Sequence, residues 1–216
     1  IGKPLVEDLS RLFGKRVFIA NDADCFALSE ASDGAAEGHD NVFGVILGTG
    51  VGGGLVINGR LVRGVNDIAG EWGHNPLPWL LPSEFPGPQC YCGKWGCIET
   101  FLSGPGFSRD FMEATGERKT AQGIIAAAVE GDRAAILAVD RYEDRLARAL
   151  AHVINIVDPS AIVLGGGLSN WTRLYSTLPK LLQKYVFSDG VSTVVLPPRF
   201  GDSSGVRGAA WLPSMP

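Results

Sequence analysis

Three cysteines within eight residues, Cys90-Tyr-Cys92-Gly-Lys-Trp-Gly-Cys97, constrain the fold of this chain more than any other feature. In a chain without a secretion signal, clustered thiols are more typical of metal binding than of disulfides. Zinc takes four tetrahedral nitrogen or sulfur ligands, and His74 is the histidine nearest in sequence. We therefore predict a closed, structural zinc site made by His74, Cys90, Cys92 and Cys97. The alternative is three thiols beside an unrelated histidine.

Composition excludes several classes of protein. The 216 residues are 45% hydrophobic and 19% charged, which excludes a disordered polyelectrolyte. A net charge of 19 − 23 = −4, without a basic block, gives no signal for nucleic-acid binding. No apolar run is long enough to cross a membrane, and the first residues do not resemble a signal peptide. A cytoplasmic protein is the expectation.

Hydrophobic periodicity predicts an α/β domain with a mixed sheet, in which strands alternate with helices after an opening hairpin. The hairpin signal is Asn58-Gly59. Residues 64–97 are rich in glycine and proline, and we expect the metal ion to order them. We predict strands over 16–20, 43–47, 55–57, 60–62, 161–164 and 193–196, and helices over 4–13, 23–36, 139–157, 174–182 and about 203–212, the last capped by Ser203 or Ser204.

Asp22 follows the predicted strand 16–20 and precedes a helix. Ligands of open α/β sheets bind at this edge, and a carboxylate there can accept the proton of a substrate hydroxyl. Asn21 beside it offers a hydrogen-bond donor and an acceptor. The alternative is that Asp22 only caps the helix.

Two glycine-rich segments are candidates for phosphate or nucleotide contact. Gly48-Thr49-Gly50 lies between two predicted strands, and Gly165-Gly166-Gly167 follows a buried one. Glycine exposes backbone N–H groups to an anion, but it also permits tight packing, so both interpretations stay open. The sequence contains no P-loop motif.

Glu71 and Glu99 flank the cysteine-rich loop. If an ion holds the two arms of the loop together, both carboxylates face one cavity, where they can accept hydrogen bonds from sugar hydroxyls. The alternative is a pair of solvated surface glutamates.

Together these segments resemble the ROK family of repressors, open reading frames and kinases, and the chain looks most like the bacterial fructokinases of that family. The resemblance covers residues 15–212. It is carried by Asn21-Asp22-Ala23-Asp24, the glycine run 48–54, Gly70-Glu71-Trp72-Gly73-His74-Asn75-Pro76, the three-cysteine motif through Glu99, Leu164-Gly165-Gly166-Gly167 and the segment 201–210. The glutamate–histidine motif followed by the three cysteines is the most specific part.

The resemblance implies the actin-like, ribonuclease-H-like ATPase fold, with flanking helices and a zinc-clipped loop. It implies a hexose kinase that uses ATP with Mg²⁺ and forms a homodimer. Asp22 matches the general base, while Asn21, Asp22, Glu71, His74 and Glu99 match sugar contacts. Gly48, Thr49 and Gly50 match the second phosphate loop, Gly165 and Gly166 match the adenosine side, and His74, Cys90, Cys92 and Cys97 match the zinc ligands.

One departure from the family pattern is the lack of an aspartate–glycine–glycine–threonine phosphate loop. The expectation is a C-terminal fragment with little turnover by itself. Residues 1–39 would be the remainder of a small domain, 40–202 a large domain with the zinc loop at 70–100, and 203–216 a helix that packs back toward the small domain. The insert Leu77-Pro78-Trp79-Leu80-Leu81 would line the sugar site, close over it or form a dimer interface.

Fructose phosphorylation at a primary hydroxyl is the favoured activity, with glucose or N-acetylglucosamine as alternative substrates. A sugar-responsive repressor is the second hypothesis, and it requires an upstream helix-turn-helix before any nucleic acid could be bound. A sugar-binding module without catalysis is the third.

Overall fold

A mixed sheet organises the computed structural model, which describes residues 3–214. Within these residues the sheet has five strands in the order β3-β2-β1-β4-β5. β1 pairs antiparallel with β2 and parallel with β4, so the hairpin and the crossover strands share one sheet, as predicted. The strands are β1 (Asn41–Leu47), β2 (Val51–Ile57), β3 (Arg60–Val62), β4 (Ala161–Gly165) and β5 (Val194–Leu196).

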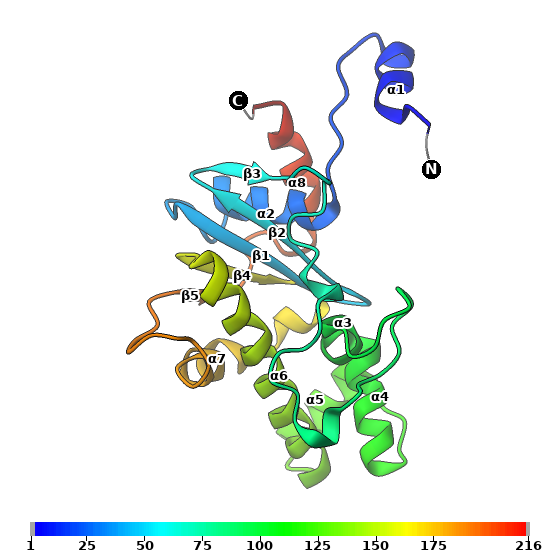
Figure 1. Ribbon diagram of the computed structural model, residues 1–216, viewed down its shortest axis with the longest axis vertical. Coiled ribbons are helices and arrows are strands. Elements are labelled where there is room, and N and C mark those ends of the chain that lie inside the picture. Colours follow the sequence, from blue (N-terminus) through cyan, green and yellow to red (C-terminus); the bar gives the residue numbers. More distant parts are fainter. Residues whose placement is uncertain (1–2, 215–216) are drawn as a thin grey trace.

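Helices cover both faces of the sheet (Figure 1). They are α1 (Leu5–Phe13), α2 (Asp22–Ser32), α3 (Ile98–Leu102), α4 (Gly104–Thr115), α5 (Ala121–Val129), α6 (Arg133–Val157), α7 (Leu174–Leu182) and α8 (Ser204–Trp211). Alternation along β1 explains the two layers, because Val42 packs on the α2 side while Phe43 and Val45 belong to the larger core under α6.

The longest helix, α6, supplies much of the larger core. Its apolar residues recur every three or four positions, as predicted, and they are buried from Val139 to Leu150. The helix ends at Val157, where Asp158 adopts a left-handed conformation before Pro159. None of the helices described by residues 3–214 is both long enough and apolar enough to cross a membrane.

Glycine places α2 directly on the sheet. Gly44 and Gly54 lie opposite each other in the β1–β2 register. A Cβ on Gly44 would lie 2.6 Å from the Ala27 Cβ, and one on Gly54 would lie 2.6 Å from the Ala23 carbonyl oxygen. Gly52 and Gly54 therefore permit close packing of α2 on β2, and this strand begins at Val51, whereas the sequence predicted a strand only over 55–57.

The strand predicted over 16–20 is wrong. These residues form no strand, and Phe18 and Ile19 are 37% and 40% exposed, because no other strand among residues 3–214 lies beside them to pair with. The adjoining α1 has no buried residue and projects from the body of the molecule (Figure 1).

Two predictions about helix ends also need correction. The second helix ends at Ser32 rather than at residue 36. The final helix begins as predicted, but the Ser203 side chain makes no cap bond, and the Ser204 hydroxyl donates instead to the Glu30 carboxylate at 2.6 Å. Glu30 is fully buried and also accepts the backbone N–H groups of Ala35 and Arg199, which joins α2 to the segment before α8.

Candidate active site and metal centre

The N-terminus of α2 presents Asn21 and Asp22 to solvent. Asn21 is the N-cap, and its side-chain oxygen accepts the Ala23 N–H at 2.9 Å. Asp22 is the first helical residue and accepts the same N–H at 2.8 Å. The N-cap of α2 is therefore Asn21, and not Asp22 as in the alternative interpretation of the sequence. The exposed Asp22 carboxylate can face a ligand.

Glu71 and His74 belong to a segment that packs on the start of β2. The Trp72 indole N–H donates to the Gly52 carbonyl at 2.9 Å, and the Trp72 ring is buried edge-on against Phe43. A Cβ on Gly52 would lie 3.3 Å from the Ala23 Cβ. The start of β2 thus lies between the N-terminus of α2 and the segment that carries Glu71.

Glu99 reaches the same place from α3. Its Oε2 atom accepts the Val51 N–H at 3.0 Å, and a Cβ on Gly50 would lie 2.7 Å from that oxygen. An antiparallel bridge between Pro76 and Cys97 brings the two arms of the irregular segment side by side. The three elements that carry the predicted sugar contacts, α2, the Glu71–His74 segment and α3, therefore meet around residues 50–52.

The four predicted metal ligands lie together. The ligand atoms of His74, Cys90, Cys92 and Cys97 are all within 4.8 Å of one another. The Cys92 and Cys97 sulfurs are 3.7 Å apart, and the Cys90 sulfur is 3.5 Å from His74 Nδ1. Atoms bound to zinc at about 2.0–2.3 Å stand roughly 3.3–3.8 Å apart at the corners of a tetrahedron, so these spacings fit a zinc ion.

The three clustered thiols also need a positive charge beside them if all of them are to lose their protons. Burial, with the neighbouring thiols, raises the pKa of Cys97 to about 12. A bound cation reverses this, because a coordinated thiol loses its proton. The donor set therefore fits a divalent soft metal, and no second group of three or more His, Cys, Asp or Glu side chains suited to a metal occurs within residues 3–214.

His74 uses its two ring nitrogens differently. Nδ1 faces the thiols, while Nε2 lies 2.9 Å from the Tyr91 hydroxyl. One imidazole can therefore bind a metal ion through Nδ1 and contact a ligand through Nε2. This arrangement is compatible with the sequence prediction, in which His74 is both a zinc ligand and a sugar contact. Sequence reasoning missed Tyr91, although its position between two predicted metal ligands tied it to this place.

The two glycine-rich segments meet at the carboxyl edge of β1 and β4. A Cβ on Gly166 would lie 2.5 Å from the Leu47 carbonyl, and one on Gly165 would lie 2.6 Å from the Phe26 ring. Both glycines permit close packing, which was one of the two interpretations left open. A Cβ on Gly48 would meet no atom within 4 Å, and Thr49 is exposed, so the first segment leaves room for a ligand.

A buried ion-pair network joins the segment between His74 and Cys90 to α6. Glu84 receives two bonds from Arg148 and one from Arg145, at 2.8–2.9 Å. Arg148 also donates to the Trp79 carbonyl at 2.9 Å. The sequence signal for this network was a pair of arginines, three residues apart, beside the apolar stripe of α6.

We expect the Glu84→Gln substitution to lower the free energy of unfolding by about 3–5 kcal/mol at pH 7, because it leaves two buried guanidinium groups without their carboxylate. The arginine bonds lower the pKa of Glu84 to about 2, against the opposing effect of burial. The stabilisation is therefore complete above pH 4.5 and is lost as the pH falls toward 2. Urea denaturation at several pH values measures this. Glu37→Gln, in an exposed pair with Arg199, is the control and should change little.

Asp24 is a buried carboxyl group beside the candidate site. One of its oxygens has no hydrogen-bond partner within residues 3–214. Burial raises the pKa of Asp24 to about 6, and the charges of Glu71 and Asp22 raise it further while Arg63 opposes them. Helix α2 therefore holds a carboxyl group that resists ionisation next to two predicted ligand contacts.

We expect Asp24→Asn to raise the free energy of unfolding by about 1–3 kcal/mol at pH 7, because the neutral amide avoids burying a charge. Between pH 3.8 and about 6 the unfolded chain releases the Asp24 proton first, so wild-type stability falls as the pH rises. The advantage of the variant should grow across that window and vanish below it.

Thermal unfolding at pH 4 and 7 measures the difference in stability between Asp24→Asn and wild type, and an equal advantage at both pH values would contradict this account. Asp8→Asn, on the exposed α1, is the control.

Comparison with known proteins identifies the family. The ROK family profile matches residues 2–215. The chain is 46% identical over 215 residues to the N-acetyl-D-glucosamine kinase of Vibrio atlanticus, a match covering 98% of this chain and 71% of that protein. It is 44% identical over 216 residues to the enzyme of the same name from Yersinia pseudotuberculosis, with the same coverage.

Solved structures of ROK family proteins have a similar fold. The crystal structure of a ROK hexokinase from Thermus thermophilus matches with a TM-score of 0.85 and 31% identity, covering 96% of this chain and 68% of that one. A ROK family transcriptional regulator, a homolog of the E. coli MLC protein, matches with a TM-score of 0.80 and 27% identity, covering 95% and 54%. The predicted fold class is therefore confirmed, and the chain belongs to the ROK family.

Proposed function

We propose that this protein is a sugar kinase that transfers the γ-phosphoryl group of ATP to an N-acetylated hexosamine. The observation that carries the proposal is the convergence of α2, the Glu71–His74 segment and Glu99 around residues 50–52 of the chain. This arrangement offers an exposed carboxylate beside several hydrogen-bonding groups suited to sugar hydroxyls.

Asp22 is the general base in this proposal. It takes the proton of the primary hydroxyl as that oxygen attacks phosphorus, while Asn21, Glu71 and Glu99 hold the other hydroxyls. Mg²⁺ bound with ATP would neutralise charge on the phosphates. The Thr49 and Gly50 N–H groups and the Thr49 hydroxyl would donate to the phosphates, in the open space next to Gly48, whose own N–H donates to the Gly50 carbonyl at 3.0 Å.

The metal ion is structural in this proposal. All four positions would be filled by His74, Cys90, Cys92 and Cys97, which leaves no open coordination site for chemistry. Its effect on the sugar would be indirect, because it orients His74 and holds the arm that leads to Glu99.

Substrate choice is where the proposal departs from the sequence expectation. The resemblance favoured fructose, but the two relatives described above are N-acetyl-D-glucosamine kinases at 46% and 44% identity. Such relatives favour N-acetylglucosamine, which was an alternative substrate, over fructose. A repressor of this family shares the fold, so the fold alone does not decide between kinase and regulator; the exposed Asp22 favours the kinase.

We also propose that residues 3–20 are part of a small domain. Helix α2 lies on the sheet and α8 packs on α2, so both belong with the large domain, whereas the sequence expectation assigned residues 1–39 and 203–216 to the small domain and 40–202 to the large one. Support comes from the unburied α1, the exposed Phe18 and Ile19, and a groove of about 560 Å³ between residues 16–20 and Leu212. The chain spans 71% of the length of the two kinase relatives described above.

A coupled assay of ADP release tests the proposal. Full-length polypeptide containing these residues should phosphorylate N-acetylglucosamine with a higher kcat/KM than glucose, mannose or fructose. A clear preference for fructose would restore the first expectation about the substrate. Lack of turnover with every hexose, together with binding to an operator DNA, would favour the repressor.

A further inference from the structure

Tyr91 is a highly exposed residue beside the candidate metal centre, with 83% of its surface accessible. Its hydroxyl lies 2.9 Å from His74 Nε2, and its ring meets the imidazole edge-on with 5.1 Å between centroids. This is the one hydrogen bond that the side chain makes within residues 3–214. The phenol is therefore attached to the site by a single polar contact.

The nitrogen that Tyr91 contacts is the one a ligand would use. When Nδ1 of His74 faces a metal ion among the thiols, Nε2 carries the ring proton and donates it outward. A phenol hydroxyl accepts that bond as a sugar hydroxyl does.

We infer that Tyr91 is a further residue of the sugar site, whose hydroxyl occupies, in the sugar-free protein, the His74 hydrogen bond that a sugar hydroxyl takes on binding. The inference rests on the proposed function. Because the side chain is exposed, it can rotate away from His74 and give up only this one contact. Tyr91 thus lowers the apparent affinity by the strength of one exposed hydrogen bond, about two- to tenfold in Kd.

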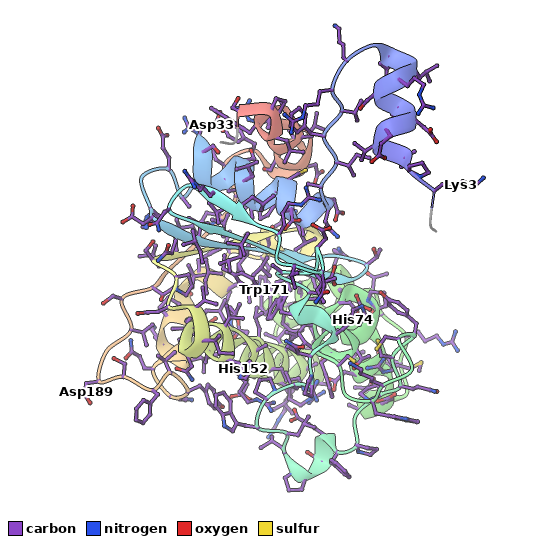
Figure 2. The ribbon with its side chains drawn as sticks, turned by 45° about the horizontal axis from the view of Figure 1, so that its top comes forward. Lys3, Asp33, His74, His152, Trp171 and Asp189 are labelled. Atoms are coloured by element: carbon purple, nitrogen blue, oxygen red, sulfur yellow. The ribbon has the colours of Figure 1, made fainter. Side chains whose placement is uncertain are left out.

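Two measurements on Tyr91→Phe, which keeps the ring and removes the hydroxyl, test the inference. In the first, solvent exchange of the His74 Nε2 proton is followed by nitrogen-edited NMR without sugar. Exchange should be about two- to tenfold faster in the variant than in wild type. His39, which lies between α2 and β1, serves as the internal reference. His152, on α6 (Figure 2), lines a pocket with Glu71 and Asn75 and is not used as a reference. An unchanged exchange rate would overturn the inference.

In the second measurement, titration calorimetry with N-acetylglucosamine gives the Kd. Tyr91→Phe should bind the sugar about two- to tenfold more tightly than wild type. The control is Trp95→Phe, an exposed aromatic side chain in the same loop, which should leave Kd unchanged. Weaker binding by Tyr91→Phe would mean that the hydroxyl is a sugar ligand rather than its substitute, and it would overturn the inference.

The two measurements separate failure of this inference from failure of the proposed function. Sugar binding with equal Kd for wild type and Tyr91→Phe would overturn the role of Tyr91 and leave the kinase proposal intact. No binding of any hexose by wild type would overturn both, even if the His74 proton exchanged faster in the variant.

Discussion

Asp22→Asn should lower kcat by about 10²–10⁴-fold in the full-length protein, while sugar binding survives. The reason is chemical: the amide keeps the shape and the contact to the Ala23 N–H, but it cannot accept the proton of the attacking hydroxyl. Asp22 is exposed at the first position of α2, so the substitution should leave the fold intact. ADP release measures kcat, and calorimetry with sugar measures binding.

The matched control for Asp22 is Asp24→Asn. It makes the same chemical change two residues along the same helix, in a buried side chain that is not proposed to touch substrate. It should keep most of its activity. Full activity in Asp22→Asn would remove Asp22 as the base, and equal losses in both variants would point to a general electrostatic effect of α2 instead.

Removal of the metal should have the second large effect. A structural zinc ion contributes on the order of 10 kcal/mol of apparent binding free energy, so chelation should loosen residues 70–100 and weaken sugar binding. Little regular structure holds this segment, which contains two short 3₁₀ turns and two isolated antiparallel bridges before α3. Elemental analysis, with amide hydrogen exchange over residues 70–100, measures both parts of the prediction.

Cysteine variants give the metal prediction a matched comparison. Cys97→Ser removes a ligand whose sulfur lies 3.7 Å from that of Cys92, and it should lose zinc. Cys25→Ser changes the fourth cysteine, which is buried in α2 outside the cluster, and it should keep one zinc per chain. Freshly purified, reduced wild-type protein without zinc would contradict the assignment of the ion.

The sequence predicted best what depends on short spacings. The three cysteines lie within eight residues, so only the return of His74 depended on the fold, and the structure places it with them. Helix α6 followed from a repeated apolar pattern over several turns. Asn58-Gly59 predicted the β2–β3 turn because both residues adopt the positive φ values that a tight hairpin needs, 50° and 70°.

Predictions were wrong where an element needs a distant partner. Residues 16–20 have the composition of a buried strand, but a strand forms only beside another strand that satisfies its backbone groups. Glycine-rich segments look alike in the sequence, although their glycines have two different structural roles. Gly48 leaves open space, whereas Gly54 and Gly166 allow neighbouring backbone to pack closely. No local pattern separates these cases, because the difference lies in what packs against each residue.

The sequence by itself therefore determined the chemical groups, their local scaffolds and the family to which the pattern belongs. The groups are four candidate metal ligands, an aspartate at the start of a helix and two glutamates beside the cysteine-rich loop. The tertiary structure decided which groups meet. The pairing of Glu84 with Arg148, 64 residues apart, and the contact between Tyr91 and His74 depend on how the chain folds back on itself. Periodicity reports which face of an element is buried, but side-chain contacts between elements depend on their packing in three dimensions.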